Sequence, residues 1–198
     1  MKRAFDIVGA AVALALLSPI LLVAAILIRV SMGAPVLFRQ RRAGRNGAPF
    51  VLVKFRTMSG ESRAGREGLD DAMRMTPTGR MLRRLSVDEL PQIYNVLRGD
   101  MSLVGPRPLL LEYLPLYSTE QARRHEVRPG ITGWAQVNGR NALTWNERLA
   151  MDVWYVDHRS LFLDMRVIAL TIRHVASVRR TGDSVLRTMP RFTGSDRE

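Results

Sequence analysis

The segment from Phe5 to Val30 constrains the fold of this chain most, because it is almost wholly apolar. As an α-helix it would be about 39 Å long, enough to cross a hydrocarbon core of about 30 Å. It exceeds the ~7–15 residues of the apolar region of a signal peptide, and no convincing cleavage site follows it. We therefore expect a membrane element over residues 1–34, interrupted at four positions: Asp6, Ser18, Pro19 and Arg29.

Two features bear on how this element meets the membrane. Basic residues flank it on both sides, Lys2 and Arg3 before it and the arginine-rich residues 39–45 after it, and basic flanks favour the cytoplasmic side. Pro19 removes a backbone hydrogen bond and bends or breaks the helix, while the Ser18 hydroxyl can bond the groups this frees. A helix–break–helix that enters and leaves by one leaflet fits both features. A kinked span also tolerates a central proline, so the residues alone leave the two topologies open.

The remaining composition bounds the function. At 198 residues, the chain has room for one domain beside this element. The net charge of +12 attracts polyanions such as nucleic acid, anionic lipid or phosphorylated ligands. The absence of cysteine excludes a disulfide scaffold and Cys-ligated zinc or iron–sulfur sites. The three histidines lack the spacing of a metal motif, so any metal is expected to be a hard, oxygen-liganded ion such as magnesium.

The soluble part predicts short strands followed by helices. Residues 36–40 and 50–55 are β-prone and are joined by a turn-rich link, which predicts a hairpin. Residues 59–75 are polar, have no steady period and have the length of a functional loop or lid. A short helix is expected over residues 78–85, and a second one is expected to end at Gly99.

Two further helices are expected towards the carboxyl end. Thr144 and Glu147 form a capping box that opens a helix through Tyr155. Residues 161–178 have apolar positions at helical spacing, with arginines that suit a membrane surface. An ordinary core helix explains that last pattern equally well. The chain beyond residue 181 is polar.

Adjacent carboxylates, Asp88 and Glu89, lie between paired arginines and Pro91. One carboxylate can act as a nucleophile or a metal ligand, while arginines neutralise phosphate charge. Ser86 with Glu89 is also a capping box, although Pro91 would then fall at the fifth helical position, where an N–H should bond. With Asp88 as the cap, Pro91 would fall where no N–H is needed. This segment alone leaves the structural and functional interpretations open.

Three arginines occur in loops that are stiffened by proline or glycine or in a turn: Arg107, Arg128 and Arg140. Proline and glycine restrict the backbone, so these arginines are expected to be pre-oriented for binding phosphate. A solvated turn whose arginine binds nothing remains the alternative for each one.

Several motifs together resemble the bacterial sugar transferase family, the monotopic phosphoglycosyl transferases. The resemblance covers residues 1 to about 175, and the chain resembles the small members that consist of the catalytic unit alone. It is carried by Lys2-Arg3-x-x-Asp6 before an apolar run broken by Ser18-Pro19, and by five blocks in family order: KFRTM (54–58), LSVDELPQ (85–92), NVLRGDMS (95–102), VGPRP (104–108) and VRPGITGWAQVNGR (127–140).

The resemblance implies a reaction. A nucleotide-diphosphate sugar, usually a UDP-sugar, gives its sugar-1-phosphate to undecaprenyl phosphate and releases UMP, with Mg²⁺ as cofactor near Asp88. Asp88 would form a covalent phosphosugar intermediate, and Glu89 would assist or organise the site. Five basic residues would bind phosphate: Arg83, Arg107, Arg140, Lys54 and Arg128. The step would belong to the assembly of a glycoconjugate such as an exopolysaccharide or lipopolysaccharide.

The resemblance also implies an architecture. The expected fold is α+β and mostly helical, with a re-entrant helix–break–helix over residues 1–34, broken at Ser18 and Pro19. A catalytic domain over residues 35–180 would carry the hairpin and interfacial amphipathic helices, followed by a polar tail over residues 181–198. The protein would be monotopic on the cytoplasmic face of the bacterial inner membrane, with membrane lipid as a partner and a homo-oligomer as a further expectation.

A competing hypothesis is a membrane-associated basic protein that binds nucleic acid without catalysis. It shares the high positive charge, but no recognisable nucleic-acid motif occurs and no nucleic-acid partner is expected. It would also leave the paired carboxylates and the arginine loops unexplained.

Overall fold

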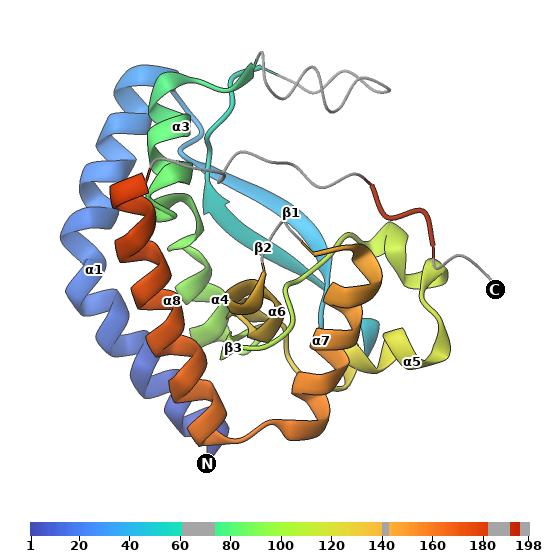
Figure 1. Ribbon diagram of the computed structural model, residues 1–198. Helices are drawn as coiled ribbons and strands as arrows, with labels where there is room; N and C mark the ends of the chain where they lie inside the picture. Colours follow the sequence, from blue (N-terminus) through green and yellow to red (C-terminus); the bar gives the residue numbers. More distant parts are fainter. Residues whose placement is uncertain (61–73, 140–142, 182–190, 195–198) are drawn as a thin grey trace.

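The computed structural model of the protein describes residues 1–60, 74–139, 143–181 and 191–194. It is mostly helical, with a long helix along one side and a β-hairpin across the middle (Figure 1). In chain order the elements are α1 (Lys2–Met32), β1 (Leu37–Ala43), η1 (Arg45–Gly47), β2 (Pro49–Phe55), α3 (Pro77–Arg84), η2 (Val87–Glu89), α4 (Gln92–Arg98), β3 (Ser102–Val104), η3 (Leu111–Leu116), α5 (Thr119–Ala122), η4 (Arg123–Glu126), β4 (Gly130–Thr132), α6 (Trp134–Asn138), α7 (Trp145–His158) and α8 (Leu161–Thr181), where η marks a 3₁₀ helix.

The apolar segment forms one continuous helix, so the expected division into two helices at Ser18 and Pro19 is wrong at the level of secondary structure. Pro19 lies inside α1 and has no N–H for the carbonyl of Ala15 one turn earlier. The Ser18 hydroxyl donates to that same oxygen at 2.8 Å. The carbonyl that proline leaves without a donor is therefore satisfied locally, and the helix continues through the proline.

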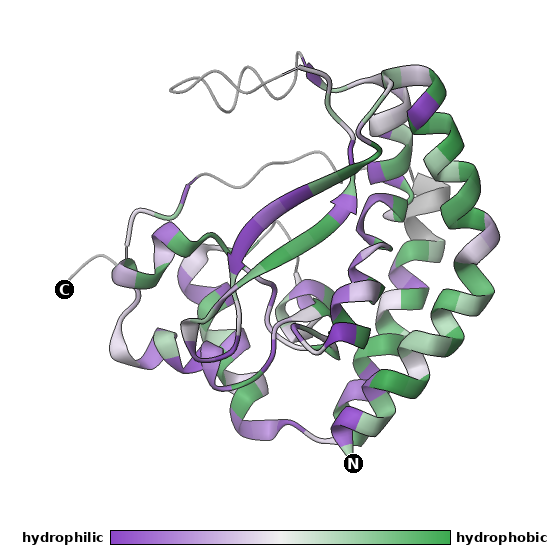
Figure 2. Ribbon diagram, turned by 180° about the vertical axis from the view of Figure 1, so that it is seen from behind, coloured by the Kyte–Doolittle hydropathy of each residue, from purple (hydrophilic) through white to green (hydrophobic). Residues whose placement is uncertain are grey.

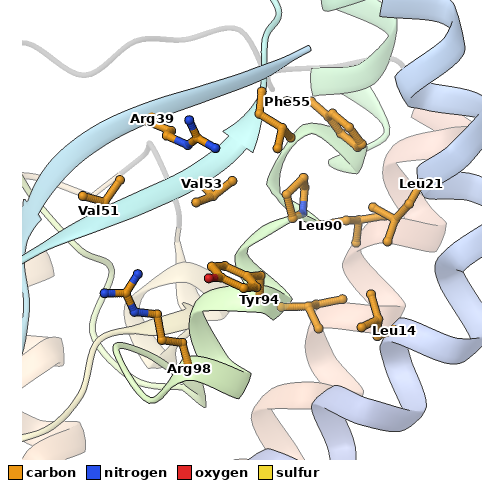
Figure 3. Close-up of a pocket in the computed structure, with 12 residues that line it drawn as sticks. Leu14, Leu21, Arg39, Val51, Val53, Phe55, Leu90, Tyr94 and Arg98 are labelled. Atoms are coloured by element: carbon orange, nitrogen blue, oxygen red, sulfur yellow. The ribbon is translucent and has the colours of Figure 1, made fainter. Parts of the chain in front are cut away.

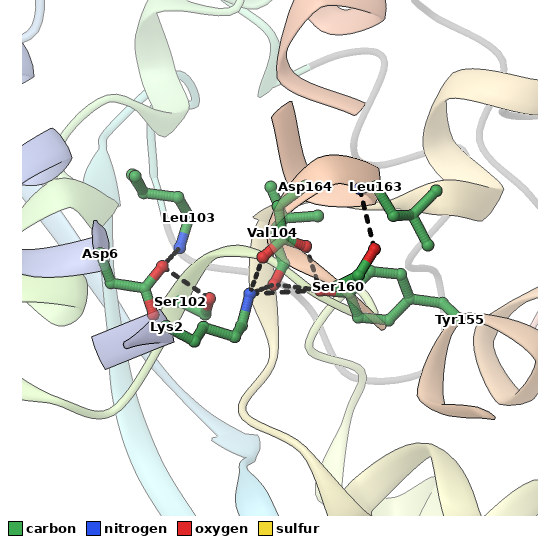
Figure 4. Close-up of polar contacts among 9 residues, drawn as sticks. All are labelled: Lys2, Asp6, Ser102, Leu103, Val104, Tyr155, Ser160, Leu163 and Asp164. Atoms are coloured by element: carbon green, nitrogen blue, oxygen red, sulfur yellow. Dashed lines mark hydrogen bonds and ion pairs between the residues drawn. The ribbon is translucent and has the colours of Figure 1, made fainter. Parts of the chain in front are cut away.

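The amino-terminal end of α1 is attached to the domain by charged side chains (Figure 4). Lys2 Nζ lies 2.5 Å from Asp164 Oδ2 at the start of α8, and the buried Asp6 accepts hydrogen bonds from Ser102 Oγ and Leu103 N at 2.8 and 3.0 Å. Arg3 donates to the last carbonyls of α4, where a cation complements the helix dipole. This end of α1 is thus fixed to α8, β3 and α4.

The carboxyl-terminal end of α1 is attached to the same body. Arg56, directly after β2, donates to the carbonyls of Met32 and Gly33 at 2.5 and 2.8 Å. Ala24 and Ile28 are buried against Phe55 and neighbouring side chains. Both ends of α1 therefore contact one continuous domain.

The outward side of α1 is apolar and uncovered by the described part of the chain, as the hydropathy colouring shows (Figure 2). Leu16 and Val30 are 73% and 82% exposed. By length and composition α1 could cross a membrane, and few of its residues are buried. Such a surface favours contact with lipid.

The hairpin and the two helices beside it form as expected. β1 and β2 pair antiparallel, with Phe38 opposite Lys54 and Arg42 opposite Phe50. α3 begins after Thr76, whose hydroxyl accepts from the backbone of Gly79 at 3.0 Å. α4 ends at Gly99, whose φ of 103° is left-handed, as a glycine permits.

The rest of the core lies among β3, β4, α7 and α8. The parallel pairing of β3 with β4 was not predicted, because each strand has only three residues. The capping box at Thr144 is confirmed. α8 packs partly into the core, since Val167 is fully buried while Phe162 is 74% exposed, and its contact with a membrane surface stays a prediction. Phe192 was expected to lie in a polar tail, but it is buried against Tyr113.

Candidate active site

The two carboxylates lie on a tight turn and do not cap a helix. Ser86 is left-handed, with φ of 55°, and its hydroxyl makes no capping bond, so the capping-box interpretation is wrong. The residue that precedes α4 is Pro91, which also excludes Asp88 as its cap. Asp88 and Glu89 belong to the short helix η2. Neither the Ser86–Glu89 capping box nor the Asp88 cap that the sequence allowed is therefore formed.

Asp88 is buried, with 7% of its surface exposed. Burial and, to a smaller extent, the charge of Glu89 raise the pKa of its carboxyl to about 6, although the cations Lys54, Arg83 and Arg107 oppose the shift. No group among the residues that the structure describes donates a hydrogen bond to this carboxylate. It is therefore a desolvated and unclamped anion, as a nucleophile requires.

Glu89 has the opposite environment. Both terminal nitrogens of Arg107 donate to its carboxylate, one of them to Oε2 at 3.2 Å and the other to Oε1. The negative charge of Glu89 raises the pKa of the Arg107 guanidinium. The paired geometry fixes the orientation of both side chains.

Four basic side chains surround the two carboxylates, and we call them the cationic shell: Arg42, Lys54, Arg83 and Arg107. Burial lowers the pKa values of Lys54 and Arg42, which shows that both charges are partly desolvated. Arg42 Nε is buried without a hydrogen-bond partner within the described structure. A buried, unsatisfied donor of this kind has a geometry open to an anionic ligand.

The position of Arg83 depends on a close approach of two segments. A Cβ added at Gly79 would lie 1.9 Å from the carbonyl oxygen of Thr57, so only glycine allows α3 to pack here. One turn later, Arg83 Nε donates to the Thr57 hydroxyl at 3.0 Å. Thr57, two residues after the end of β2, therefore orients Arg83 of α3 beside Asp88.

The backbone of Arg107 is held by a buried ion pair. Arg124 and Asp152 are each about 2% exposed, and Arg124 Nε and its terminal nitrogen lie 3.1 and 2.7 Å from Asp152 Oδ2. The same terminal nitrogen donates to the Arg107 carbonyl at 2.7 Å. This pair links η4 and α7 to the loop that carries Arg107.

The structure brings together five of the residues expected at the site: Asp88, Glu89, Lys54, Arg83 and Arg107. Arg128 lies elsewhere, where its Nε donates to the Gly99 carbonyl at 2.8 Å and stabilises the end of α4. Arg140 lies outside the described residues, as does most of the expected loop over residues 59–75.

Sequence reasoning missed Arg42, Thr57 and the Arg124–Asp152 pair as parts of this site. Arg42 could have been found from strand alternation, because it lies on the same face of the hairpin as Phe38, the partner of Lys54. The other contacts join residues 26 and 28 positions apart and leave no local pattern.

The donor set fits magnesium only in part. No group of three or more His, Asp or Glu side chains is placed for a metal within the described part of the chain. Asp88 offers one unclamped carboxylate, and Mg²⁺ is commonly held by one or two carboxylates together with substrate phosphates. The residues therefore fit an ion shared with a phosphate-bearing substrate and not a cage made of protein alone.

Comparison with known proteins identifies the family in which this site occurs. The model of the family described as bacterial sugar transferase matches residues 1–178. A Bacillus subtilis protein named as an uncharacterized sugar transferase, EpsL, is 52% identical over 98% of this chain and 96% of its own length.

Two relatives have names that state a reaction. A UDP-glucose:undecaprenyl-phosphate glucose-1-phosphate transferase of Caulobacter vibrioides is 45% identical over 86% of this chain and 68% of its own length. A UDP-N-acetylgalactosamine-undecaprenyl-phosphate N-acetylgalactosaminephosphotransferase of Aeromonas hydrophila is 40% identical over 88% of this chain and 43% of its own length.

Proposed function

This chain belongs to the bacterial sugar transferase family and is a transferase, and from that premise we propose that it moves a sugar-1-phosphate from a UDP-sugar to undecaprenyl phosphate. One observation carries the proposal: a buried, unclamped Asp88 lies beside an arginine-clamped Glu89 inside a shell of cations. Relatives whose names include undecaprenyl phosphate support the acceptor.

The first half-reaction is assigned to Asp88. Its carboxylate oxygen attacks the β-phosphorus of the donor, and the bond from that phosphorus to the bridging oxygen breaks. UMP leaves with the bond's electrons, and the sugar phosphate stays on Asp88 as an acyl phosphate. Burial favours this step, because a desolvated carboxylate is more basic and more reactive than one in water.

In the second half-reaction, a phosphate oxygen of the acceptor attacks the same phosphorus and releases the Asp88 carboxylate. The product is a polyprenyl diphosphate sugar, the first membrane-bound intermediate of glycoconjugate assembly. Glu89 and Arg107 orient the acceptor phosphate, while Arg42, Lys54 and Arg83 neutralise the diphosphate charge. Phosphoryl transfer depends mainly on such positioning and charge neutralisation.

Mg²⁺ is proposed as the cofactor, held by Asp88 together with the donor diphosphate. When bound, it would supply positive charge to the diphosphate oxygens. Asp88 is the only member of the pair whose carboxylate has no arginine clamp, which supports this assignment within the described residues.

The membrane topology is proposed to be monotopic, with both ends of α1 on the cytoplasmic side. The contacts of Lys2 with Asp164 and of Arg56 with Met32 attach the two ends to one domain. A helix that crossed the bilayer would separate its ends by the full hydrocarbon thickness. We therefore favour a helix that enters a single leaflet with its apolar side.

A donor panel tests the reaction. Purified protein is incubated with undecaprenyl phosphate, Mg²⁺ and one of several UDP-sugars, and the release of UMP is followed. We expect release that requires the acceptor for multiple turnovers and is lost in the Asp88→Asn variant. Absence of UMP with every donor, although the protein is folded, would reject the proposal. The basic nucleic-acid-binding protein without activity is no longer a competing hypothesis, because the chain is a transferase.

A further inference from the structure

An apolar groove of about 620 Å³ runs between the hairpin, α1 and α4 (Figure 3). Its volume is in the range of sites that bind small molecules. Its walls come from three elements that are distant in sequence. Its apolar lining includes Leu14 and Leu21 of α1, Leu37 and Val51 of the hairpin, and Leu90 and Tyr94 around the start of α4.

One wall of the groove belongs to the membrane helix. Leu14 and Leu21 are seven residues apart, so they lie on one side of α1 two turns apart. Leu14 is itself 39% exposed, so this wall reaches the uncovered surface of α1. A molecule dissolved in the hydrocarbon that covers α1 can therefore enter the groove without crossing water.

The groove also adjoins the segment that carries the two carboxylates. Leu90 and Pro91 line it, and they directly follow Asp88 and Glu89 in the chain. Consecutive Cα atoms are about 3.8 Å apart, so the backbone of both carboxylates lies within about 8 Å of that of Leu90. The groove thus borders both α1 and the backbone of the segment that carries Asp88.

The charges of the groove match an amphiphile. Among the described residues that line the groove, only Arg39 and Arg98 are charged, and both are exposed, above and below Val51 and Val53 in the left half of Figure 3. Apolar walls offer no partners to the polar groups of a nucleotide or a sugar. They suit the hydrocarbon chain of an amphiphile whose phosphate group stays outside the groove.

We propose that this groove holds the first isoprene units of the polyprenyl phosphate acceptor, next to its phosphate. The inference rests on the proposed function, since it names where the acceptor of that reaction lies. The remaining chain would extend past Leu14 and Leu21 into the bilayer. The groove would therefore select the acceptor by the length and branching of its chain near the phosphate.

The test compares two soluble acceptors, geranyl phosphate and the longer farnesyl phosphate, with the full-length protein in detergent. Leu37→Glu places a charge in the groove, and Leu116→Glu in η3 is the matched control, because both leucines are 36% exposed. Two readouts are taken: the donor-only phosphosugar adduct by intact mass spectrometry, and kcat/KM for each acceptor.

We expect the wild type and Leu116→Glu to prefer farnesyl phosphate. In Leu37→Glu that preference should fall at least about tenfold, equivalent to about 1.4 kcal/mol, while the donor-only adduct forms normally. Val51→Glu, at a second groove position, should behave in the same way. Equal loss for both acceptors, or no chain preference in the wild type, would overturn the inference. Failure of the wild type to form the adduct would instead count against the proposed function.

A photoreactive farnesyl phosphate separates the acceptor from ordinary lipid. Crosslinks should appear on peptides that contain Val51 or Tyr94, and undecaprenyl phosphate should abolish them. Vesicles of phosphatidylglycerol at the same phosphate concentration should leave them unchanged. Equal competition by phosphatidylglycerol would show a general lipid site and would refute the assignment to the acceptor.

Discussion

Arg107 holds the carboxylate of Glu89 through both of its terminal nitrogens, and Asp88, the preceding residue in the chain, receives no such bond from the described residues. Two chemically similar side chains thus have different environments. One is oriented and neutralised, and the other is desolvated and available to react.

This difference predicts distinct phenotypes for two nearly isosteric variants. Asp88→Asn should abolish turnover and form no adduct with donor alone, because the attacking oxygen is lost. Glu89→Gln should turn over slowly yet retain some phosphosugar adduct, because Asp88 remains. Intact mass spectrometry with donor alone distinguishes them, and an adduct on the Asp88→Asn protein would refute the nucleophile assignment.

The raised pKa of Asp88 predicts that the inactive variant is the more stable one. The folded protein keeps the Asp88 proton up to about pH 6, whereas the unfolded chain releases it near pH 3.8. Between these values the folded state binds more protons, so its stability falls as the pH rises through this window. At pH 7, Asp88→Asn should therefore stabilise the protein by on the order of 1–3 kcal/mol. Denaturation at pH 7 and at pH 3.5 checks this, since the advantage should vanish at the lower pH.

The cationic shell can be tested with neighbouring arginines on α3. Arg83 donates to Thr57 beside Asp88, whereas Arg84 is exposed. Arg83→Lys keeps the charge but loses the planar group, and the loss of one charged hydrogen bond of roughly 1.5–3 kcal/mol should lower kcat/KM about ten- to a hundredfold. Arg84→Lys should change kcat/KM by less than about threefold. Equal small effects of the two substitutions would remove Arg83 from the site.

The buried Arg124–Asp152 ion pair, which binds the Arg107 carbonyl, is expected to affect the stability of the fold and the activity separately. Asp152→Asn leaves the Arg124 charge unpaired and should destabilise the fold by about 3–5 kcal/mol. The double variant Arg124→Met with Asp152→Leu removes both charges and should recover most of that stability. It should remain impaired in kcat/KM, because the Arg107 carbonyl has lost its donor. Full activity in the stable double variant would show that the pair has no positioning role.

The attachment of both ends of α1 predicts their common exposure to the cytoplasm. Met1→Cys and Ser31→Cys each introduce the single cysteine of an otherwise cysteine-free chain, and both positions are exposed. An impermeant thiol reagent should label both in inverted inner-membrane vesicles and neither in intact spheroplasts. Labelling of one position from each side would establish a spanning helix.

Features that depend on neighbours along the chain could be predicted from the sequence. The apolar run of α1, the β-prone runs of β1 and β2, the capping box at Thr144 and the end of α4 at Gly99 are all local patterns, and these elements form as expected except that α1 continues through Pro19. The family motifs also identified the carboxylate pair, because they lie in short continuous blocks.

The surroundings of the site residues, by contrast, depend on contacts between distant segments. The place of Arg128 depends on a carbonyl 29 residues away. The burial of Asp88 comes from segments that meet across the fold. Its pKa and its lack of a clamp follow from that burial, and no local pattern encodes contacts made between distant parts of the chain.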